Sequence, residues 1–180
     1  TALLVLLVIQ CVIAVALYWP EDMMPAMRDK QPLVAFNADL LDEIYISDRE
    51  DNEVILVRQG DSWRLPELEE LPADETMVAD LITALAYQAH GRPVADSIPA
   101  RQRFQVAASL NQRRLTLIGE GALLGTIYLG TSPGFRRVHA RNEAASAIYS
   151  VNFNNFDAPA SASAWLKRAL LQVSEPTAIR

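Results

Sequence analysis

Cysteine is almost absent from this chain. Cys11 is the single one, so no disulfide can form within the chain. The compartment stays open, because an oxidising space permits disulfides without requiring them. The residues before Cys11, Val8-Ile9-Gln10, lack the small side chains expected ahead of a lipidated cysteine. We therefore interpret Cys11 as a small apolar residue of a membrane helix.

Histidine is scarce as well. The two present, His90 and His139, stand far apart in the sequence, and no Cys/His cluster exists. A metal site needs several ligands at suitable spacing, so we expect no metal and no other cofactor. We expect structural roles for both, His90 at a helix end and His139 in a strand.

Motifs of catalysis and nucleotide binding are missing too. There is no Gly-x-Ser-x-Gly, and Gly119, Gly121 and Gly125 lack the Lys-Ser/Thr pair and following helix of a phosphate loop. The acidic stretch Glu67–Glu75 lacks a calcium-loop pattern, and we interpret it as a solvated loop leading into a helix. The net charge of −6 gives nucleic-acid binding little support. We therefore expect neither an enzyme nor a nucleic-acid-binding protein.

The acidic charge is unevenly distributed. Residues 21–75 carry sixteen acidic and five basic side chains, whereas residues 76–180 carry six acidic and eleven basic ones. One interpretation is a docking surface, or an acidic face directed away from anionic lipid headgroups. The alternative, which we favour, is a solvated surface whose two halves partly neutralise each other in the fold.

A long uncharged run opens the sequence. Thr1–Trp19 contains no charged residue and one strongly polar residue, Gln10. Nineteen helical residues span about 28 Å, close to the roughly 30 Å of bilayer hydrocarbon. Tyr18 and Trp19 suit the headgroup level, and Glu21 and Asp22 then end the run. The run predicts a transmembrane helix over residues 1–19, in contact with membrane lipid.

Two rival interpretations of this run are weaker. It is longer than the apolar region of a typical signal peptide, and bulky Leu17-Tyr18-Trp19 follow the small residues Ala14-Val15-Ala16. A buried core helix is the weaker interpretation because the run is apolar on every face. Because the first residue is Thr rather than Met, we expect that topology-setting positive charges precede it. The acidic flank favours a single-pass inner-membrane protein whose globular domain is periplasmic or otherwise extracytoplasmic.

The chain after the run divides by composition. Prolines at 20, 25 and 32 predict a juxtamembrane linker over residues 20–40, followed by a domain over 41–172 and a tail over 173–180. Alternating residues with polar turns between them predict an antiparallel meander of three strands. These strands cover residues 43–47, 53–58 and 62–65, and the last directs Trp63 and Leu65 to one face.

A helix should separate this meander from a longer one. Asp74 can cap the helix, and an apolar stripe at helical spacing runs from Met77 to Leu85. A second β region follows, with a loop at 131–134, and a final helix spans about 160–172. Its strands lie near residues 104–106, 115–118, 126–129, 136–140 and 147–151. The order predicts an α+β fold with a mostly antiparallel sheet.

Candidate partner contacts are basic or lie in the membrane. Arginine forks suit carboxylates and phosphates, and the strongest grouping is Arg113, Arg114, Arg136 and Arg137, together with Arg141. The alternative, which we favour, is edge-strand charge that blocks aggregation. Gln10 could hydrogen-bond to another membrane helix.

The order of several short motifs resembles a known family. Gly60-Asp61-Ser62-Trp63-Arg64-Leu65-Pro66, the helix from Asp74, Thr126-Ile127-Tyr128-Leu129-Gly130, Arg137-Val138-His139-Ala140-Arg141 and Trp165-Leu166-Lys167-Arg168 are similar to domain of unknown function 4340. The likeness covers roughly residues 40–172. It implies a bacterial envelope protein with one N-terminal anchor, encoded beside gliding-motility-type ABC transporters with permease and GldG-like subunits. It implies no catalytic residues.

Two functional hypotheses follow. The first is a non-catalytic accessory subunit of an envelope ABC transporter complex, whose anchor binds the transmembrane subunits and whose domain binds their extracytoplasmic parts or the substrate. The second is a free-standing module that binds an envelope or cell-wall glycan through exposed aromatics and the four arginines.

Overall fold

The computed structural model describes residues 10, 32–86 and 91–167. The described helices are α2 (Glu75–Ala86) and α3 (Ile98–Arg103). The strands are β1 (Glu43–Asp48), β2 (Glu53–Gln59), β3 (Ser62–Leu65), β4 (Leu71–Pro72), β5 (Val106–Ala107), β6 (Leu110–Asn111), β7 (Arg113–Gly119), β8 (Ala122–Leu129), β9 (Val138–Asn142) and β10 (Tyr149–Val151). Short 3-10 turns cover Ala38–Leu40, Pro66–Leu68, Asn155–Asp157 and Ala162–Trp165.

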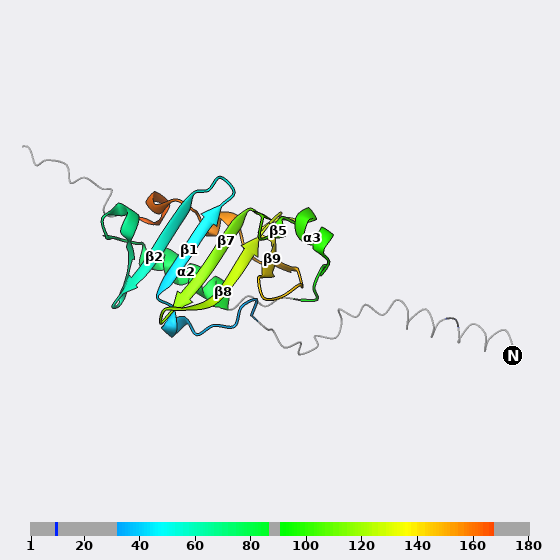
Figure 1. Ribbon diagram of the computed structural model, residues 1–180, viewed down its shortest axis with the longest axis horizontal. Coiled ribbons are helices and arrows are strands. Elements are labelled where there is room, and N and C mark those ends of the chain that lie inside the picture. Colours follow the sequence, from blue (N-terminus) through cyan, green and yellow to red (C-terminus); the bar gives the residue numbers. More distant parts are fainter. Residues whose placement is uncertain (1–9, 11–31, 87–90, 168–180) are drawn as a thin grey trace, which may run out of the picture.

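Eight of the strands form one antiparallel sheet in the order β10-β9-β8-β7-β1-β2-β3-β4. The predicted α+β class with a mostly antiparallel sheet is therefore confirmed. The two meanders are joined at the centre, where β1 pairs with β7 as well as with β2. Figure 1 shows these strands side by side, with α2 behind them.

The main core lies between α2 and one face of the sheet. Side chains on a strand alternate between faces, so Ile44 and Ile46 of β1 point inward while Tyr45 and Ser47 point outward. Trp63 and Leu65 are both buried, as predicted for one face of β3. Each fully buried aliphatic side chain stabilises the fold by roughly 1.5–3 kcal/mol. The α2 side chains in this core are Val78, Leu81 and Leu85.

The helix predicted from Asp74 is confirmed. The Asp74 carboxylate accepts hydrogen bonds from the backbone N–H groups of Thr76 and Met77, at 3.0 and 3.3 Å. It thereby satisfies two donors that have no partner within the helix. The helix is described as far as Ala86, and His90 lies outside the described residues.

A second, smaller core covers the opposite face at one end of the sheet. Tyr128 of β8 points away from the main core and is buried against Val106 and Ile148. The helix α3 begins at its cap Ser97 and was not predicted from the sequence. Phe104, predicted to begin a strand, ends α3 instead, and Gln105 has a φ of 55° that interrupts extended backbone.

The predicted final helix over 160–172 is wrong where the structure describes it. Ala162–Trp165 form a 3-10 turn, and Leu166 then pairs with Ala73 as an isolated β-bridge. The Trp165 carbonyl accepts a hydrogen bond from Asp74 N at 2.7 Å, and the buried Trp165 indole donates to the Pro159 carbonyl. These tertiary partners hold the backbone out of an α-helix. Residues 168–172 lie outside the described part.

The start of the chain is described only in part. The predicted transmembrane helix over 1–19 lies outside the described residues except for Gln10, which is helical and exposed. Among the residues that are described, no helix has the length and apolar character needed to cross a membrane. Within the predicted linker, Leu33 and Val34 are buried in the main core, and Asn142 donates a hydrogen bond to the Leu33 carbonyl.

Candidate functional site

The four arginines proposed as partner contacts are divided between two faces. Arg113 and Arg114 are neighbours on β7, so their side chains point to opposite faces of the sheet. Arg114 lies on the open face, at a shallow hollow of about 220 Å³ that Tyr45 and Glu53 also line. Arg113 lies on the α2 side, together with Arg136 and Arg137. Only three of the four arginines therefore share a site.

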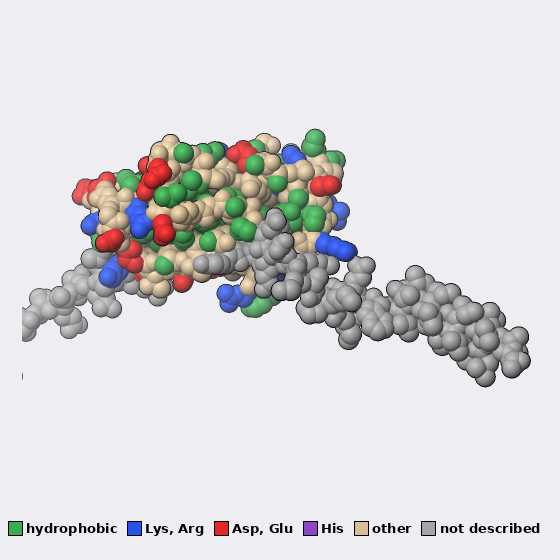
Figure 2. Space-filling model, turned by 90° about the horizontal axis from the view of Figure 1, so that it is seen from below, with side chains coloured by type: hydrophobic (Ala, Val, Ile, Leu, Met, Phe, Trp, Pro, Cys, Tyr) green, Lys and Arg blue, Asp and Glu red, His purple; other side chains and the backbone are tan. Residues whose placement is uncertain are grey.

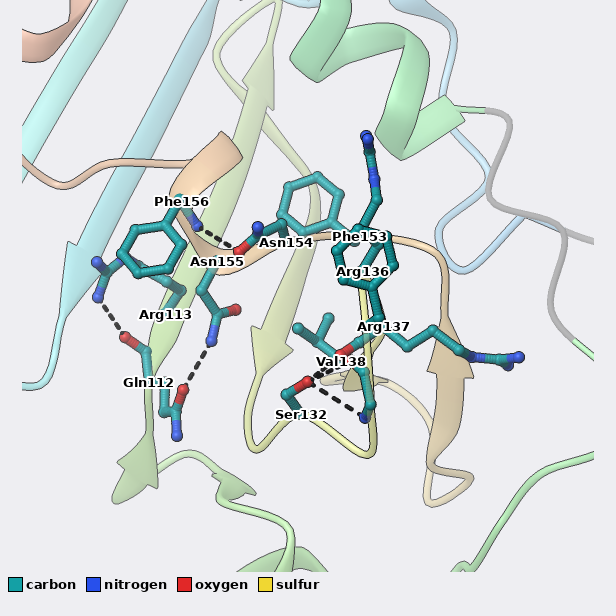
Figure 3. Close-up of a pocket in the computed structure, with 12 residues that line it drawn as sticks. Gln112, Arg113, Ser132, Arg136, Arg137, Val138, Phe153, Asn154, Asn155 and Phe156 are labelled. Atoms are coloured by element: carbon teal, nitrogen blue, oxygen red, sulfur yellow. Dashed lines mark hydrogen bonds between the residues drawn. The ribbon is translucent and has the colours of Figure 1, made fainter.

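This shared site is a pocket of about 450 Å³. One wall is the loop between β8 and β9, the other is the segment after β10, and the beginning of β7 lies beneath them (Figure 3). The residues that line it are Gln112, Arg113, Ser132, Gly134–Val138 and Phe153–Phe156.

Local hydrogen bonds shape the β8–β9 loop. The Ser132 hydroxyl lies 2.7 Å from the carbonyl oxygens of Gly134 and Arg137, and Arg137 N donates to the Gly134 carbonyl. Arg136 has a φ of 52°, a left-handed conformation that non-glycine residues rarely adopt. The turn leaves the Phe135 side chain 91% exposed at its tip.

The facing segment is held by asparagine side chains. The Asn154 carboxamide oxygen accepts from Phe156 N and so begins the turn Asn155–Asp157. The Asn155 amide donates to Gln112 Oε1 at 2.7 Å and to the Gly130 carbonyl at 3.2 Å. These contacts leave the Phe156 side chain 83% exposed beside the pocket.

The three arginines are not equally available to a ligand. Arg113 donates to the carbonyls of Ala158 and Gln112 and lies 3.9 Å from the Asp48 carboxylate. Arg137 donates to the hydroxyl and the carbonyl of Ser150. Arg136 is exposed, and no described residue accepts a hydrogen bond from it or forms an ion pair with it. Arg136 is therefore the cation that a ligand can neutralise.

A second hollow of about 380 Å³ continues the pocket toward α2. The two share Arg136, Phe153 and Phe156. The hollow has an apolar floor of Met77, Leu81 and Ala84, with Asp80 and Asp157 at its edge. Together they form a groove, which we call the arginine groove, running from the β8–β9 loop to α2.

Arg141, which belonged to the basic grouping in the sequence, has a structural role. It is buried, and it donates to the carbonyls of Val106, Asn142, Glu143 and Ala145. Its guanidinium lies 4.9 Å from the centre of the Tyr128 ring, within the range of a cation–π interaction. Arg141 is therefore not available to a partner.

His139 also serves the fold. It is buried, its ring centre lies 4.2 Å from that of Phe104, and its Nδ1 lies 2.8 Å from the Thr131 carbonyl oxygen. Burial lowers the pKa of His139, and the hydrogen bond to Thr131 opposes this in part. Its position beneath the β8–β9 loop supports the loop from below.

The acidic stretch predicted to be a solvated loop contains further structural contacts. Glu67 accepts from Ile55 N at 2.9 Å, and Glu75 accepts from Trp63 N at 3.1 Å. Burial is the main cause that raises the pKa of Glu67. Within the described part of the chain, no three metal-ligating side chains lie close enough together to hold an ion.

The uneven distribution of charge along the sequence is also seen in the folded domain. The strand order places β2, β3 and β4 at one end of the sheet and β8, β9 and β10 at the other. Figure 2 shows acidic side chains in greatest number toward the end that carries β2. The arginine groove lies at the other end, between β9 and α2.

Sequence reasoning missed Phe135, Phe156 and Asn155. A signal was present for Phe135, because a large aromatic residue within the loop sequence Ser132-Pro133-Gly134-Phe135-Arg136 has no place in an alternating pattern. No comparable signal marks Asn155, whose position depends on contacts with Gln112 and Gly130, far from it in the sequence.

Comparison with known proteins gives one match. The sequence model of a family described as "Domain of unknown function (DUF4340)" matches residues 63–180, which include the whole arginine groove. No curated protein and no solved structure matches the chain.

Proposed function

The chain belongs to the DUF4340 family, and from this premise we propose that it is a non-catalytic accessory subunit of a bacterial envelope ABC transporter complex. Residues 1–19 anchor it in the inner membrane beside the transmembrane subunits. Its globular domain binds their extracytoplasmic parts. The observation that carries this proposal is the arginine groove, where Phe135 and Phe156 expose most of their surface beside the unpaired Arg136.

The composition of the groove supports protein binding. Aromatic residues and arginine are enriched in protein interfaces, and a few such residues supply most of the binding energy. An exposed aromatic ring contributes no free energy of burial. A partner that covers Phe135 and Phe156 removes their apolar surface from water, and this burial stabilises the complex. The other polar groups of the pocket mostly hold the groove together, as Gln112, Asn154 and Ser132 do.

The proposed anchor follows from the sequence alone. Thr1–Trp19 is uncharged and has the length of a bilayer span, and Gln10 supplies one polar group for contact with a neighbouring helix. The acidic residues after it favour the extracytoplasmic side for the domain. Protease added to spheroplasts should digest the domain, and full protection would contradict this topology.

Affinity purification of the full chain from detergent-solubilised membranes tests the complex. We expect the permease and GldG-like subunits to be recovered with it. A double variant, Phe135→Ala with Phe156→Ala, should lose them, whereas Arg114→Ala on the opposite face of the sheet should retain them. Repeated recovery of the chain alone would refute the transporter assignment.

The second candidate function is binding of an envelope glycan. It is favoured by aromatic rings beside arginine, since Phe135 and Phe156 could pack on sugar rings while Arg136 binds a carboxylate or phosphate. A glycan array incubated with the detergent-solubilised full chain separates the two functions. Binding that survives Arg114→Ala and is lost in the Phe135/Phe156 double variant would favour the glycan.

A further inference from the structure

One acceptor in the arginine groove has no partner. Both hydrogens of the Asn155 amide are donated, to Gln112 and to the Gly130 carbonyl, and this fixes the orientation of the carboxamide. Its oxygen Oδ1 is buried and accepts no hydrogen bond. Figure 3 shows this oxygen turned away from Gln112 and toward the middle of the pocket. Since buried polar groups are nearly always paired, this acceptor indicates a donor supplied by a ligand.

Arg136 provides the second element of recognition. It belongs to both hollows of the groove, and in Figure 3 its side chain extends toward α2, whereas Arg137 points away toward β10. The pocket around Asn155 is lined by three arginines and by no carboxylate, whereas Asp80 and Asp157 line the adjoining hollow. The backbone at Arg136 is in a conformation that would suit glycine better, with a φ of 52°. Because this backbone conformation is strained, the presence of arginine here indicates a role other than stabilising the loop.

The third element is apolar. The hollow next to α2 has Met77, Leu81 and Ala84 as its floor, and Phe153 and Phe156 as the wall toward Asn155. Its volume of about 380 Å³ is ample for one large side chain. The free acceptor, the cation and the apolar hollow therefore follow one another along a single groove.

We propose that the arginine groove binds an extended acidic peptide segment of the partner protein. A backbone N–H of the segment donates to Asn155 Oδ1, an aspartate or glutamate pairs with Arg136, and a neighbouring large apolar side chain enters the hollow at α2. This inference rests on the proposed accessory function and names the chemistry that the partner must present.

A peptide fits this groove better than a glycan does. A sugar needs several free polar groups for its hydroxyls, yet the polar side chains here are already engaged. Gln112 accepts from Asn155 and donates to Gln105, Asn154 caps the turn at Phe156, and Arg137 is bound to Ser150. Apart from the carboxylates of Asp80 and Asp157 at the edge of the hollow, the groove thus offers one acceptor, one free cation and apolar surface. These groups match a peptide backbone with one acidic and one apolar side chain.

The test is a peptide array incubated with the detergent-solubilised full chain. Each ten-residue peptide of glycine and serine carries a glutamate at one to three residues from a phenylalanine or leucine, and matched spots carry glutamine instead. We expect strongest binding when the acidic and apolar residues are adjacent or two apart, and at least tenfold weaker binding of the glutamine counterparts. Equal binding of the two series would overturn the proposal, as would tighter binding of tri-galacturonic acid than of any peptide.

Arg136→Gly gives the decisive variant. Glycine adopts a positive φ without strain, so this variant should fold at least as stably as the parent while losing tenfold or more in affinity for the glutamate peptides. Arg114→Ala, which removes an arginine from the opposite face, is the matched control and should bind as the parent does. Retained peptide binding in a folded Arg136→Gly variant would overturn the proposal.

The two proposals fail separately. If transporter subunits are recovered with the chain but no acidic peptide binds, the groove inference is wrong and the accessory function stands. If acidic peptides bind in an Arg136-dependent way but no transporter subunit is recovered, the groove inference stands and its partner is a different envelope protein.

Discussion

At the scale of single residues, Gly130 is a position where the backbone comes very close to another segment. A Cβ atom added there would overlap the carbonyl oxygens of Phe104 and Gln105. Both are backbone atoms, so no side-chain rotation can relieve the overlap. The same approach lets Thr131 N donate to the Phe104 carbonyl at 2.9 Å. Because Gly130 has no side chain, the end of α3 can pack directly against the β8–β9 loop.

We predict that Gly130→Ala lowers the free energy of unfolding by about 3 kcal/mol, the upper part of the usual range for overpacking. Urea unfolding followed by tryptophan fluorescence measures it, because Trp63 and Trp165 are both buried. Gly134→Ala is the control, since nothing lies within 4 Å of a Cβ there, and it should change stability by about 0.5 kcal/mol at most. Equal effects of the two changes would contradict the proposed close approach.

His139 makes stability depend on pH. Its pKa in the folded protein lies below the ordinary value of 6.5, mainly because it is buried. Between the folded pKa and 6.5, the unfolded chain binds more protons than the folded one, so stability rises with pH in this window. On acidification, stability falls as the pH drops below about 6.5 and levels off below the folded pKa.

The measurement is urea unfolding at a series of pH values for the parent and for His139→Gln, whose side chain does not titrate in this window. We expect the difference in unfolding free energy between the two proteins to change between neutral pH and the folded pKa of His139. A difference that stays constant across this range would show that His139 has no such effect.

At the scale of elements, the start of α2 depends on one side chain. Asp74 accepts from Thr76 N and Met77 N, and its own backbone N–H donates to Trp165. We predict that Asp74→Ala destabilises the protein by about 1 kcal/mol, the typical cost of losing an N-cap, whereas Asp74→Ser retains most of the stability. The exposed Asp80→Ala, on the same helix, is the control in thermal unfolding. A loss in the serine variant as large as in the alanine variant would contradict a capping role.

Elements with a clear local pattern could be predicted from the sequence. The strands β1, β2 and β3 alternate mainly between buried and partly buried residues, and polar turns separate them. The Asp48 carboxylate, for example, accepts from the backbone N–H groups of Glu50 and Asn52 in the first turn. Local chemistry and tertiary structure agree in these places, so pattern alone is sufficient.

Elements whose form depends on distant partners could not be predicted. The segment around Trp165 has helical spacing, yet it forms only a 3-10 turn, because the hydrogen bond from Asp74 and the bridge between Leu166 and Ala73 hold its end. The arginine groove could not be predicted in full for a related reason. Sequence composition found Arg113, Arg114, Arg136 and Arg137, but neighbours on a strand face opposite sides, and this placed Arg114 on the far face.

At the scale of the whole molecule, the sheet joins two meanders that are separated in the sequence by α2 and α3. The pairing of β1 with β7 brings Glu43 opposite Ile118, so the first meander cannot complete its core without the second. The same order places the arginine groove at the end of the sheet away from β2, β3 and β4. The acidic residues of the first meander therefore lie away from the arginine groove.

The proposed anchor gives a prediction for the full chain. We expect membrane insertion of Thr1–Trp19 because every residue except Gln10 is apolar or only weakly polar. One aspartate at the centre of a span costs roughly 2.5–3.5 kcal/mol. Replacing both Val8 and Ile9 with aspartate should therefore release the chain from membranes washed with alkaline carbonate, while the parent stays in the pellet. Leu123→Asp, at an exposed position of β8, is the matched control and should stay in the pellet. If the doubly substituted chain also remains in the pellet, contacts of the globular domain rather than residues 1–19 hold the protein at the membrane.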